Sequence, residues 1–343
     1  SDSMRCVASA YLVYATLLPL SVTQMTCDAA GDEPSEKVAS DSDSENNSLM
    51  NLAFKTGGGT QLWTDHVHRD GYRIQQNALT GHWRLLNADN VRQCWGSREH
   101  CQERLDKLRP HVESAEPQHV VVLLHGLMRS RGSMLPMELK LKNDSFDEVI
   151  RFSYASTRAS IADHAQALRD VLESMPLNTQ FSFVGHSMGI IVTRHMLGDL
   201  MQDDPKQVLP RCHAMVMLGP PNQGAAIARR LAPTGLFGLV TGKGGMELGP
   251  RWEELEKRLA TPPFPFAIVA GNLSFQSVSI RHPLLEGTSD FVVTVEETML
   301  DGAHLHETYP VLHSVMMNDD EVQELTIEFL TTHGPGSNDV ESD

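Results

Sequence analysis

Five nearly continuous apolar segments limit most strongly how this chain can fold. They are rich in β-branched residues and lie at 119–124, 149–154, 181–184, 213–218 and 264–269. Strands that are apolar on both faces are typical of a parallel sheet buried between two layers of helices. Apolar residues also recur at helical spacing over 159–172 and 190–200. The sequence therefore predicts an α/β fold in which a mainly parallel sheet carries helices on both faces.

A different pattern precedes this region. Residues 61–86 hold three short segments of strand character, separated by Asp70-Gly71 and Thr80-Gly81. An Asp-Gly pair between alternating segments is a strong hairpin signal. We therefore expect a small antiparallel β-meander within residues 51–116, followed by the α/β domain at 117–331.

The two ends of the chain are expected to lie outside these domains. Residues 7–20 are apolar but fall short of the roughly 20 residues that span a bilayer, so 1–27 is predicted to be a signal peptide or an N-terminal anchor. Residues 28–50 are predicted to form an acidic disordered linker, and 332–343 a disordered acidic tail. The leader predicts an exported protein, whether secreted, periplasmic or membrane-anchored; a cytoplasmic protein with an apolar N-terminus is the alternative.

Charge and cysteine usage exclude several functions. The chain has 28 Lys and Arg against 44 Asp and Glu, a net charge of −16, and no run rich in Lys or Arg. Because nucleic-acid binding depends on a basic surface, we expect no nucleic-acid partner. Beyond the leader there are three cysteines, Cys94, Cys101 and Cys212, without Cys-x-x-Cys spacing. We therefore expect no disulfide framework and no zinc site, and nothing in the sequence indicates a metal or another cofactor.

The pentapeptide Gly185-His186-Ser187-Met188-Gly189 is the strongest functional signal. It joins the apolar segment 181–184 to the helical pattern at 190–200. A Gly-x-Ser-x-Gly turn between a strand and a helix lifts the serine hydroxyl above the sheet, and side chains at the two glycine positions would clash. The sequence therefore predicts that Ser187 is a nucleophile.

A nucleophilic serine needs a histidine to accept its proton and an acid to orient that histidine. In this type of fold both groups follow the serine in the chain. Among the histidines after Ser187, His313 is preferred because it lies between an apolar segment and the helical pattern at 320–330. His304 and His306 are expected in an exposed loop.

The acid is predicted to be Asp290. It ends a polar turn at 286–290 that leads into Phe291-Val292-Val293, and the acid belongs at the carboxyl edge of the sheet. Asp301, which precedes a glycine, is the competitor and could equally be a turn residue.

Acyl transfer places negative charge on a carbonyl oxygen, which two backbone N–H groups usually stabilise. The N–H of Met188, next to the nucleophile, is predicted to be one of them. The other is predicted to be the N–H of Leu127, in the turn His125-Gly126-Leu127 that follows the first buried segment.

These motifs resemble, in their order, those of the α/β-hydrolase lipases and esterases. The resemblance rests on residues 125–127, 185–189, 218–224 and 287–290 and on His313, and it covers about 117–330. It implies the α/β-hydrolase fold, a triad made of these Ser, Asp and His residues, and a single-glycine oxyanion loop. It also implies a variable cap, here about residues 225–261, which could be a mobile lid or a fixed cover.

The sequence thus predicts a serine hydrolase that cleaves carboxylic esters through an acyl-enzyme. Its partner is an ester or lipid substrate, with contact to a membrane surface or lipid interface through the cap. Two alternatives stay open: an acyltransferase or deacylase of anchored lipids, and a surface interaction protein with a vestigial triad.

Overall fold

The computed structural model describes residues 61–110, 118–144, 146, 148–231, 236–275, 278–279 and 288–336. The predicted leader and linker, the first residues of the predicted meander and the end of the acidic tail lie outside the described residues. Within this part of the chain, no helix is both long and apolar enough to cross a membrane.

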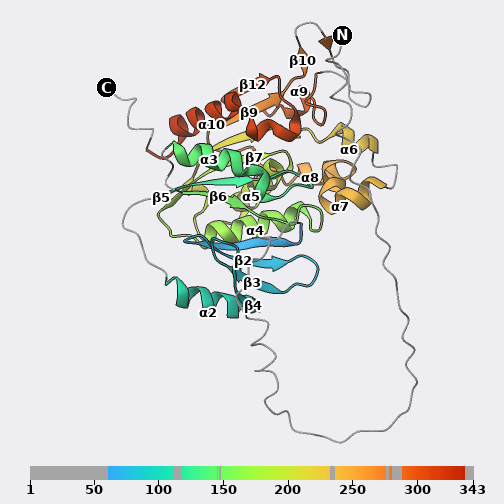
Figure 1. The fold of residues 1–343 in the computed structure, drawn as a ribbon. Helices are drawn as coiled ribbons and strands as arrows, with labels where there is room; N and C mark the ends of the chain where they lie inside the picture. Colours follow the sequence, from blue (N-terminus) through green and yellow to red (C-terminus); the bar gives the residue numbers. More distant parts are fainter. Residues whose placement is uncertain are drawn as a thin grey trace, which may run out of the picture. The chain divides into compact units, whose positions relative to one another are not determined.

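Six parallel strands form the central sheet, in the order β12-β9-β8-β7-β5-β6 (Figure 1). Their bounds are β5 Gln118–Leu124, β6 Glu148–Phe152, β7 Thr179–His186, β8 Cys212–Leu218, β9 Phe266–Gly271 and β12 Leu305–Tyr309. The first five match the apolar segments in the sequence. The edge strand β12 was not predicted, and the expectation that His306 lies in an exposed loop is wrong, because His306 is part of this strand and pairs with Ile268 of β9.

Alternate residues of the strands face two separate hydrophobic clusters. On one face, Leu124 and its neighbours pack with α4 (Ile161–Glu173) and α5 (Met188–Gln202). On the other, Leu123 packs with α3 (Leu135–Asn143) and α10 (Asp320–His333). Figure 1 shows α3 and α10 on the opposite side of the sheet from α4. Both faces are therefore covered, as the apolar strands predict.

Local signals in the sequence set where α4 begins. Ser160 accepts a hydrogen bond from the backbone N–H of Asp163, whose carboxylate accepts one from the N–H of Ser160 in return. This capping box satisfies N–H groups that the first helical turn leaves free. The helix then buries one apolar face, which includes Ile161, Leu168 and Leu172.

The meander consists of β1 (Trp63–Arg69), β2 (Tyr72–Asn77), β3 (Trp83–Leu86) and β4 (Arg92–Gly96), paired antiparallel in that order. Helix α2 (Arg98–Leu108) covers it. Val67, Ile74, Leu85, Cys94, Cys101 and Leu105 form its core. Neither β4 nor α2 was predicted. Both cysteines of this core are free.

Strand β1 joins the meander to the central sheet. The backbone N–H of Asp65 donates to the carbonyl of Ser153, and the N–H of Ser153 donates to the Asp65 carboxylate, both at 2.8 Å. Ser153 directly follows β6, the edge strand of the sheet. Nearby, His66 Nδ1 lies 2.8 Å from Asp170 Oδ2 of α4. The meander is therefore fastened to the sheet edge and to the helix beside it.

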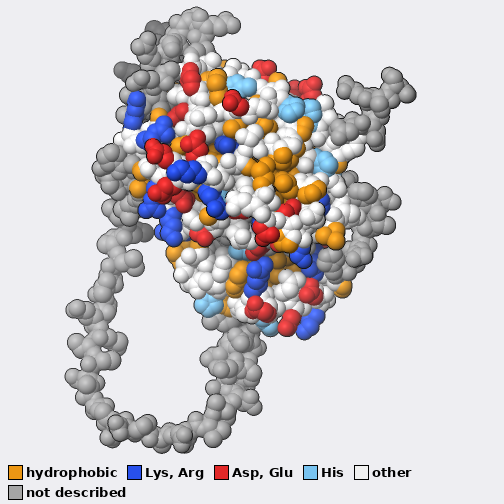
Figure 2. All heavy atoms as spheres, turned by 180° about the vertical axis from the view of Figure 1, so that it is seen from behind, with side chains coloured by type: hydrophobic (Ala, Val, Ile, Leu, Met, Phe, Trp, Pro, Cys, Tyr) orange, Lys and Arg blue, Asp and Glu red, His pale blue; other side chains and the backbone are white. Residues whose placement is uncertain are grey.

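The segment predicted to be a cap holds α6 (Ala226–Leu231), α7 (Leu236–Leu248) and α8 (Trp252–Glu256). Leu248, Trp252 and Leu255 are buried in the same cluster as α5. The second half of this segment is thus packed on the core. On the face shown in Figure 2, acidic and basic side chains are interspersed and many of the hydrophobic ones gather in one cluster.

Four short elements of the described chain lie between β9 and α10, in addition to β12. The pair β10 (Ser274–Phe275) and β11 (Val278–Ser279) is antiparallel. Helix α9 (Val295–Thr298) begins with a second capping box, made by Thr294 and Glu297. The 3-10 helix η4 (His313–Asn318) then leads into α10. The acid and base that the sequence predicts therefore lie in the connections around β9 and β12.

Candidate active site

Ser187 lies in a sharp turn between β7 and α5. Its φ of 54° and ψ of −121° are strained for a residue with a side chain. A Cβ added at Gly185 would lie 2.4 Å from Ile190 Cδ1, and one at Gly189 would lie 2.8 Å from Leu124 Cβ. The N–H of Ser187 donates to the carbonyl of Leu218 on the next strand at 2.8 Å. The turn thus holds the serine at the carboxyl edge of the sheet.

His313 and Asp290 form a hydrogen-bonded pair. His313 Nδ1 lies 2.7 Å from Asp290 Oδ2. Oδ1 of the same carboxylate accepts the N–H groups of Val292 and Val293 at 2.9 and 2.8 Å. Because Asp290 is only 1% exposed, this carboxylate is oriented toward the imidazole and keeps the proton of a neutral ring on Nδ1. Asp301, the competing acid, is exposed in a turn.

Glycines at the ends of two strands make room for this pair. Gly219 follows β8 directly and has a φ of +55°, and a Cβ there would lie 2.9 Å from His313 Nδ1. Gly271 ends β9, where a Cβ would come within 2.5 Å of the Asp290 Cβ. Any larger residue at either position would therefore collide with the pair.

Ser187 and His313 line one cavity of about 380 Å³. Much of its wall is apolar and comes from the oxyanion loop, the cap and the Asp290 turn: Leu127, Met128, Pro221, Ala225, Ile227, Ala228, Leu248, Val292 and Val293. Among the described residues, no hydrogen bond joins Ser187 Oγ to His313. Catalytic hydrogen bonds are often long in free enzymes and shorten only in the reacting complex.

The loop that holds Leu127 is fixed by side chains from elsewhere in the chain. The N–H of Met128, which has a φ of 60°, donates to Ser156 Oγ at 3.1 Å. Ser156 Oγ donates in turn to Gln61 Oε1 at 3.1 Å. The side-chain amide of Gln61 also donates to the carbonyl of Arg129. The sequence analysis missed Gln61 and Ser156, because no local pattern signals contacts between residues that are 28 to 95 positions apart.

His186, next to the nucleophile, contacts the main chain of His313. Its Nε2 donates to the carbonyl of His313 at 2.8 Å, so this nitrogen carries a proton. Burial is the main reason why the pKa of His186 lies well below its usual value, and the charge of the nearby His313 lowers it further. His186 therefore supports the loop of the predicted base.

His125, at the start of the oxyanion loop, is also fully buried. Its ring stacks on Tyr154 with centroids 4.1 Å apart. Burial lowers the pKa of His125 to about 4. This ring is therefore neutral at physiological pH and packs in the core.

Comparisons with known proteins match part of the chain to one family. The model of a family described as "Putative serine esterase (DUF676)" matches residues 114–231. This stretch includes Leu127, Ser187 and Met188 but ends before Asp290 and His313. No curated protein matches the chain.

Several solved structures resemble the chain at low sequence identity, among them two bacterial proteins and one metagenomic protein. Lipase BlEst2 of Bacillus licheniformis, in its mature form, is 17% identical, with a TM-score of 0.48 over 65% of this chain and 93% of that chain. The product of gene lin2722 of Listeria innocua is 18% identical (TM-score 0.44, 62% and 94%). The metagenomic carboxyl esterase MGS0156 is 14% identical (TM-score 0.45, 64% and 76%). Because these identities and TM-scores are so low, the fold assignment rests on the strand topology of this chain and on the family match.

The strand order, the strained serine turn between β7 and α5 and the family match all agree with the resemblance in the sequence. The predicted α/β-hydrolase fold, preceded by an antiparallel meander, is confirmed. The chain thus has the α/β-hydrolase fold, its residues 114–231 match the family described as "Putative serine esterase (DUF676)", and lipases and esterases are among the solved structures that resemble it.

Proposed function

We propose that this protein hydrolyses carboxylic esters through an acyl-enzyme formed on Ser187. The hydrogen bond between His313 and Asp290, beside a cavity that Ser187 also lines, is the observation that supports this most. An oriented imidazole next to a serine in a strained turn is the arrangement that makes a serine nucleophilic.

The reaction follows from the roles of these groups. His313 Nε2 takes the proton of Ser187 as Oγ attacks the ester carbonyl carbon, and the buried Asp290 stabilises the resulting imidazolium. The N–H groups of Leu127 and Met188 donate to the oxyanion; among the described residues, neither has another hydrogen-bond acceptor. When the tetrahedral intermediate collapses, the alcohol leaves with the proton from His313. Water, activated by the same histidine, then releases the acid and regenerates Ser187.

The wall of the cavity suits an ester with an apolar part. Ile227, Leu248 and Val293 offer aliphatic surface close to the nucleophile. Burying an aliphatic group of the substrate there is favourable at about 25 cal/mol per Å² of apolar surface. A short or medium acyl chain is therefore the proposed apolar part.

The test is the hydrolysis of 4-nitrophenyl butyrate by wild type and by Ser187→Ala. We expect kcat to fall by roughly 10⁴ or more, because the remaining groups only bind the ester and stabilise the oxyanion. Ser174→Ala, a change at the end of α4 outside the cavity, is the matched control and should keep the wild-type rate. A Ser187→Ala protein with an unchanged circular dichroism spectrum and a retained rate would contradict the proposal.

A further inference from the structure

Arg129 brings an unbalanced positive charge to the cavity. Among the described residues that line the cavity, Arg129 is the only Lys or Arg, and none is Asp or Glu. The other polar groups of the lining are Ser187, Ser314 and two histidines, of which His186 is neutral. The cavity that holds the proposed nucleophile therefore carries a net positive charge.

No carboxylate within the described chain compensates this charge. Arg129 forms no ion pair there, and its Nε atom is buried without a hydrogen-bond partner. Burial lowers the pKa of Arg129, and no acidic group opposes this effect. Arg151 differs from Arg129 in this respect, because it forms an ion pair with Glu138. A partly buried guanidinium without a partner costs free energy, which a bound anion would offset.

Arg129 lines the same cavity as Ser187 and His313, and its main chain is fixed there. Its positive charge helps to lower the pKa of both His186 and His125. Both polar groups of its main chain are held: the N–H donates to the carbonyl of Gly126 at 3.2 Å, and the carbonyl accepts from the side-chain amide of Gln61. The charge therefore belongs to the oxyanion loop itself.

We propose, on the basis of the ester hydrolysis proposed above, that the preferred substrate is an ester that carries an anionic group, a carboxylate or a phosphoryl group, which pairs with Arg129. The apolar part of such an ester packs against Ile227, Leu248 and Val293. The anionic group belongs either to the acyl part or to the alcohol part, and the two cases need separate substrates.

The test uses two pairs of esters that differ only by a charge. In the acyl arm, mono-4-nitrophenyl adipate is compared with its neutral methyl ester. In the alcohol arm, 4-butyryloxybenzoate is compared with its neutral methyl ester. The quantity measured is the ratio of kcat/KM for the charged ester to kcat/KM for the neutral ester, for wild type, Arg129→Gln and Arg129→Lys.

We expect Arg129→Gln to lower this ratio by roughly 10- to 100-fold in one of the two arms, as expected for the loss of a charge-assisted hydrogen bond. Arg129→Lys keeps the charge but not the bidentate geometry, so it should recover part of the ratio. Arg158→Gln removes the same charge from an exposed position outside the cavity and should leave the ratio at its wild-type value. The arm that responds identifies the part of the ester that carries the anion.

Two results overturn the inference while ester hydrolysis stands. If Arg129→Gln slows the charged and the neutral ester equally, Arg129 acts on the oxyanion or on the loop and not on a substrate charge. If neither ratio changes while both esters are hydrolysed, no anion pairs with Arg129. Failure of the proposed function looks different, because wild type would then hydrolyse none of the four esters, and the inference would fall with it.

Discussion

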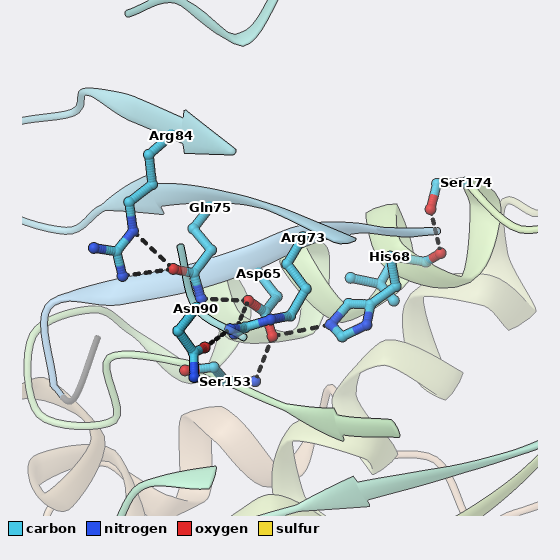
Figure 3. Close-up of polar contacts among 9 residues, drawn as sticks. Asp65, His68, Arg73, Gln75, Arg84, Asn90, Ser153 and Ser174 are labelled. Carbon is cyan, nitrogen blue, oxygen red and sulfur yellow. Dashed lines mark hydrogen bonds and ion pairs between the residues drawn. The ribbon is translucent and has the colours of Figure 1, made fainter. Parts of the chain in front are cut away.

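The carboxylate of Asp65 fastens the meander to the α/β domain, and Asp65→Ala tests how much this contact stabilises the fold. The carboxylate is fully buried and accepts from the Ser153 N–H at 2.8 Å, Gln75 Nε2 at 2.6 Å and His68 Nε2 at 3.1 Å (Figure 3). Arg73, itself only 2% exposed, lies 3.4 Å away. Alanine would remove the shared acceptor and leave the Arg73 guanidinium buried without its carboxylate.

The size of the effect follows from these contacts. Removing one partner of a buried ion pair typically costs about 3–5 kcal/mol, against a total stability of about 5–15 kcal/mol for a typical folded protein. We therefore expect Asp65→Ala to lower the free energy of unfolding by about 3 kcal/mol or more. Asp65→Asn keeps the shape of the side chain and one acceptor, so it should cost less.

Urea unfolding followed by circular dichroism and by tryptophan fluorescence measures this effect, since Trp63, Trp83 and Trp95 lie in the meander. Asp89→Ala, a change at an exposed carboxylate of the same meander, is the matched control and should shift stability by less than about 0.5 kcal/mol. A midpoint for Asp65→Ala that equals the midpoint of this control would refute the argument from the buried ion pair.

Three further predictions concern pH, the acid and the oxyanion loop. Burial alone would raise the pKa of Asp65, but Arg73 and the hydrogen bond from His68 hold it far below its usual value of 3.8. The ionised carboxylate therefore stabilises the fold above about pH 4, and this contribution is lost as the pH falls further. Acid unfolding between about pH 5 and pH 2 should accordingly depend less on pH in Asp65→Asn than in wild type. Asp290→Asn should lower kcat by roughly 10²- to 10⁴-fold, whereas Asp301→Asn should change it little; the reverse order in a kinetic comparison would transfer the acid role to Asp301. Gln61→Ala should lower kcat roughly 10-fold with a smaller change in KM, because it releases the loop that carries the Leu127 N–H; an effect on KM alone would argue against this positioning role.

The central strands could be predicted because each is apolar on both faces. Strand β12 escaped prediction for the opposite reason. It lies at the edge of the sheet, with Glu307 and Thr308 exposed, so its sequence resembles a polar loop. Helix α2 buries only Cys101 and Leu105, too few positions for a clear helical pattern.

In the site, the sequence predicted which residues to test. The strand–turn–helix pattern around Ser187 indicates a fold in which the acid and then the base come after the serine in the chain. The structure brings His313 and Asp290 within hydrogen-bond distance and leaves Asp301 exposed. The support of the oxyanion loop by Gln61 could not be predicted, because that contact depends on how the meander docks. The charge of Arg129 was visible in the sequence, but its lack of a carboxylate partner appears only in three dimensions.

The most direct test of the proposed chemistry is labelling with a fluorophosphonate, followed by mass spectrometry of the digested protein. An activated serine attacks the phosphorus and expels fluoride, which leaves one covalent phosphonyl group per chain. The account predicts one adduct per chain, on the peptide that contains Ser187, and slow labelling of His313→Ala because the serine then lacks its base. Labelling at another residue, no labelling of the folded wild-type protein, or equal labelling of Ser187→Ala would contradict the assignment of Ser187 as the nucleophile.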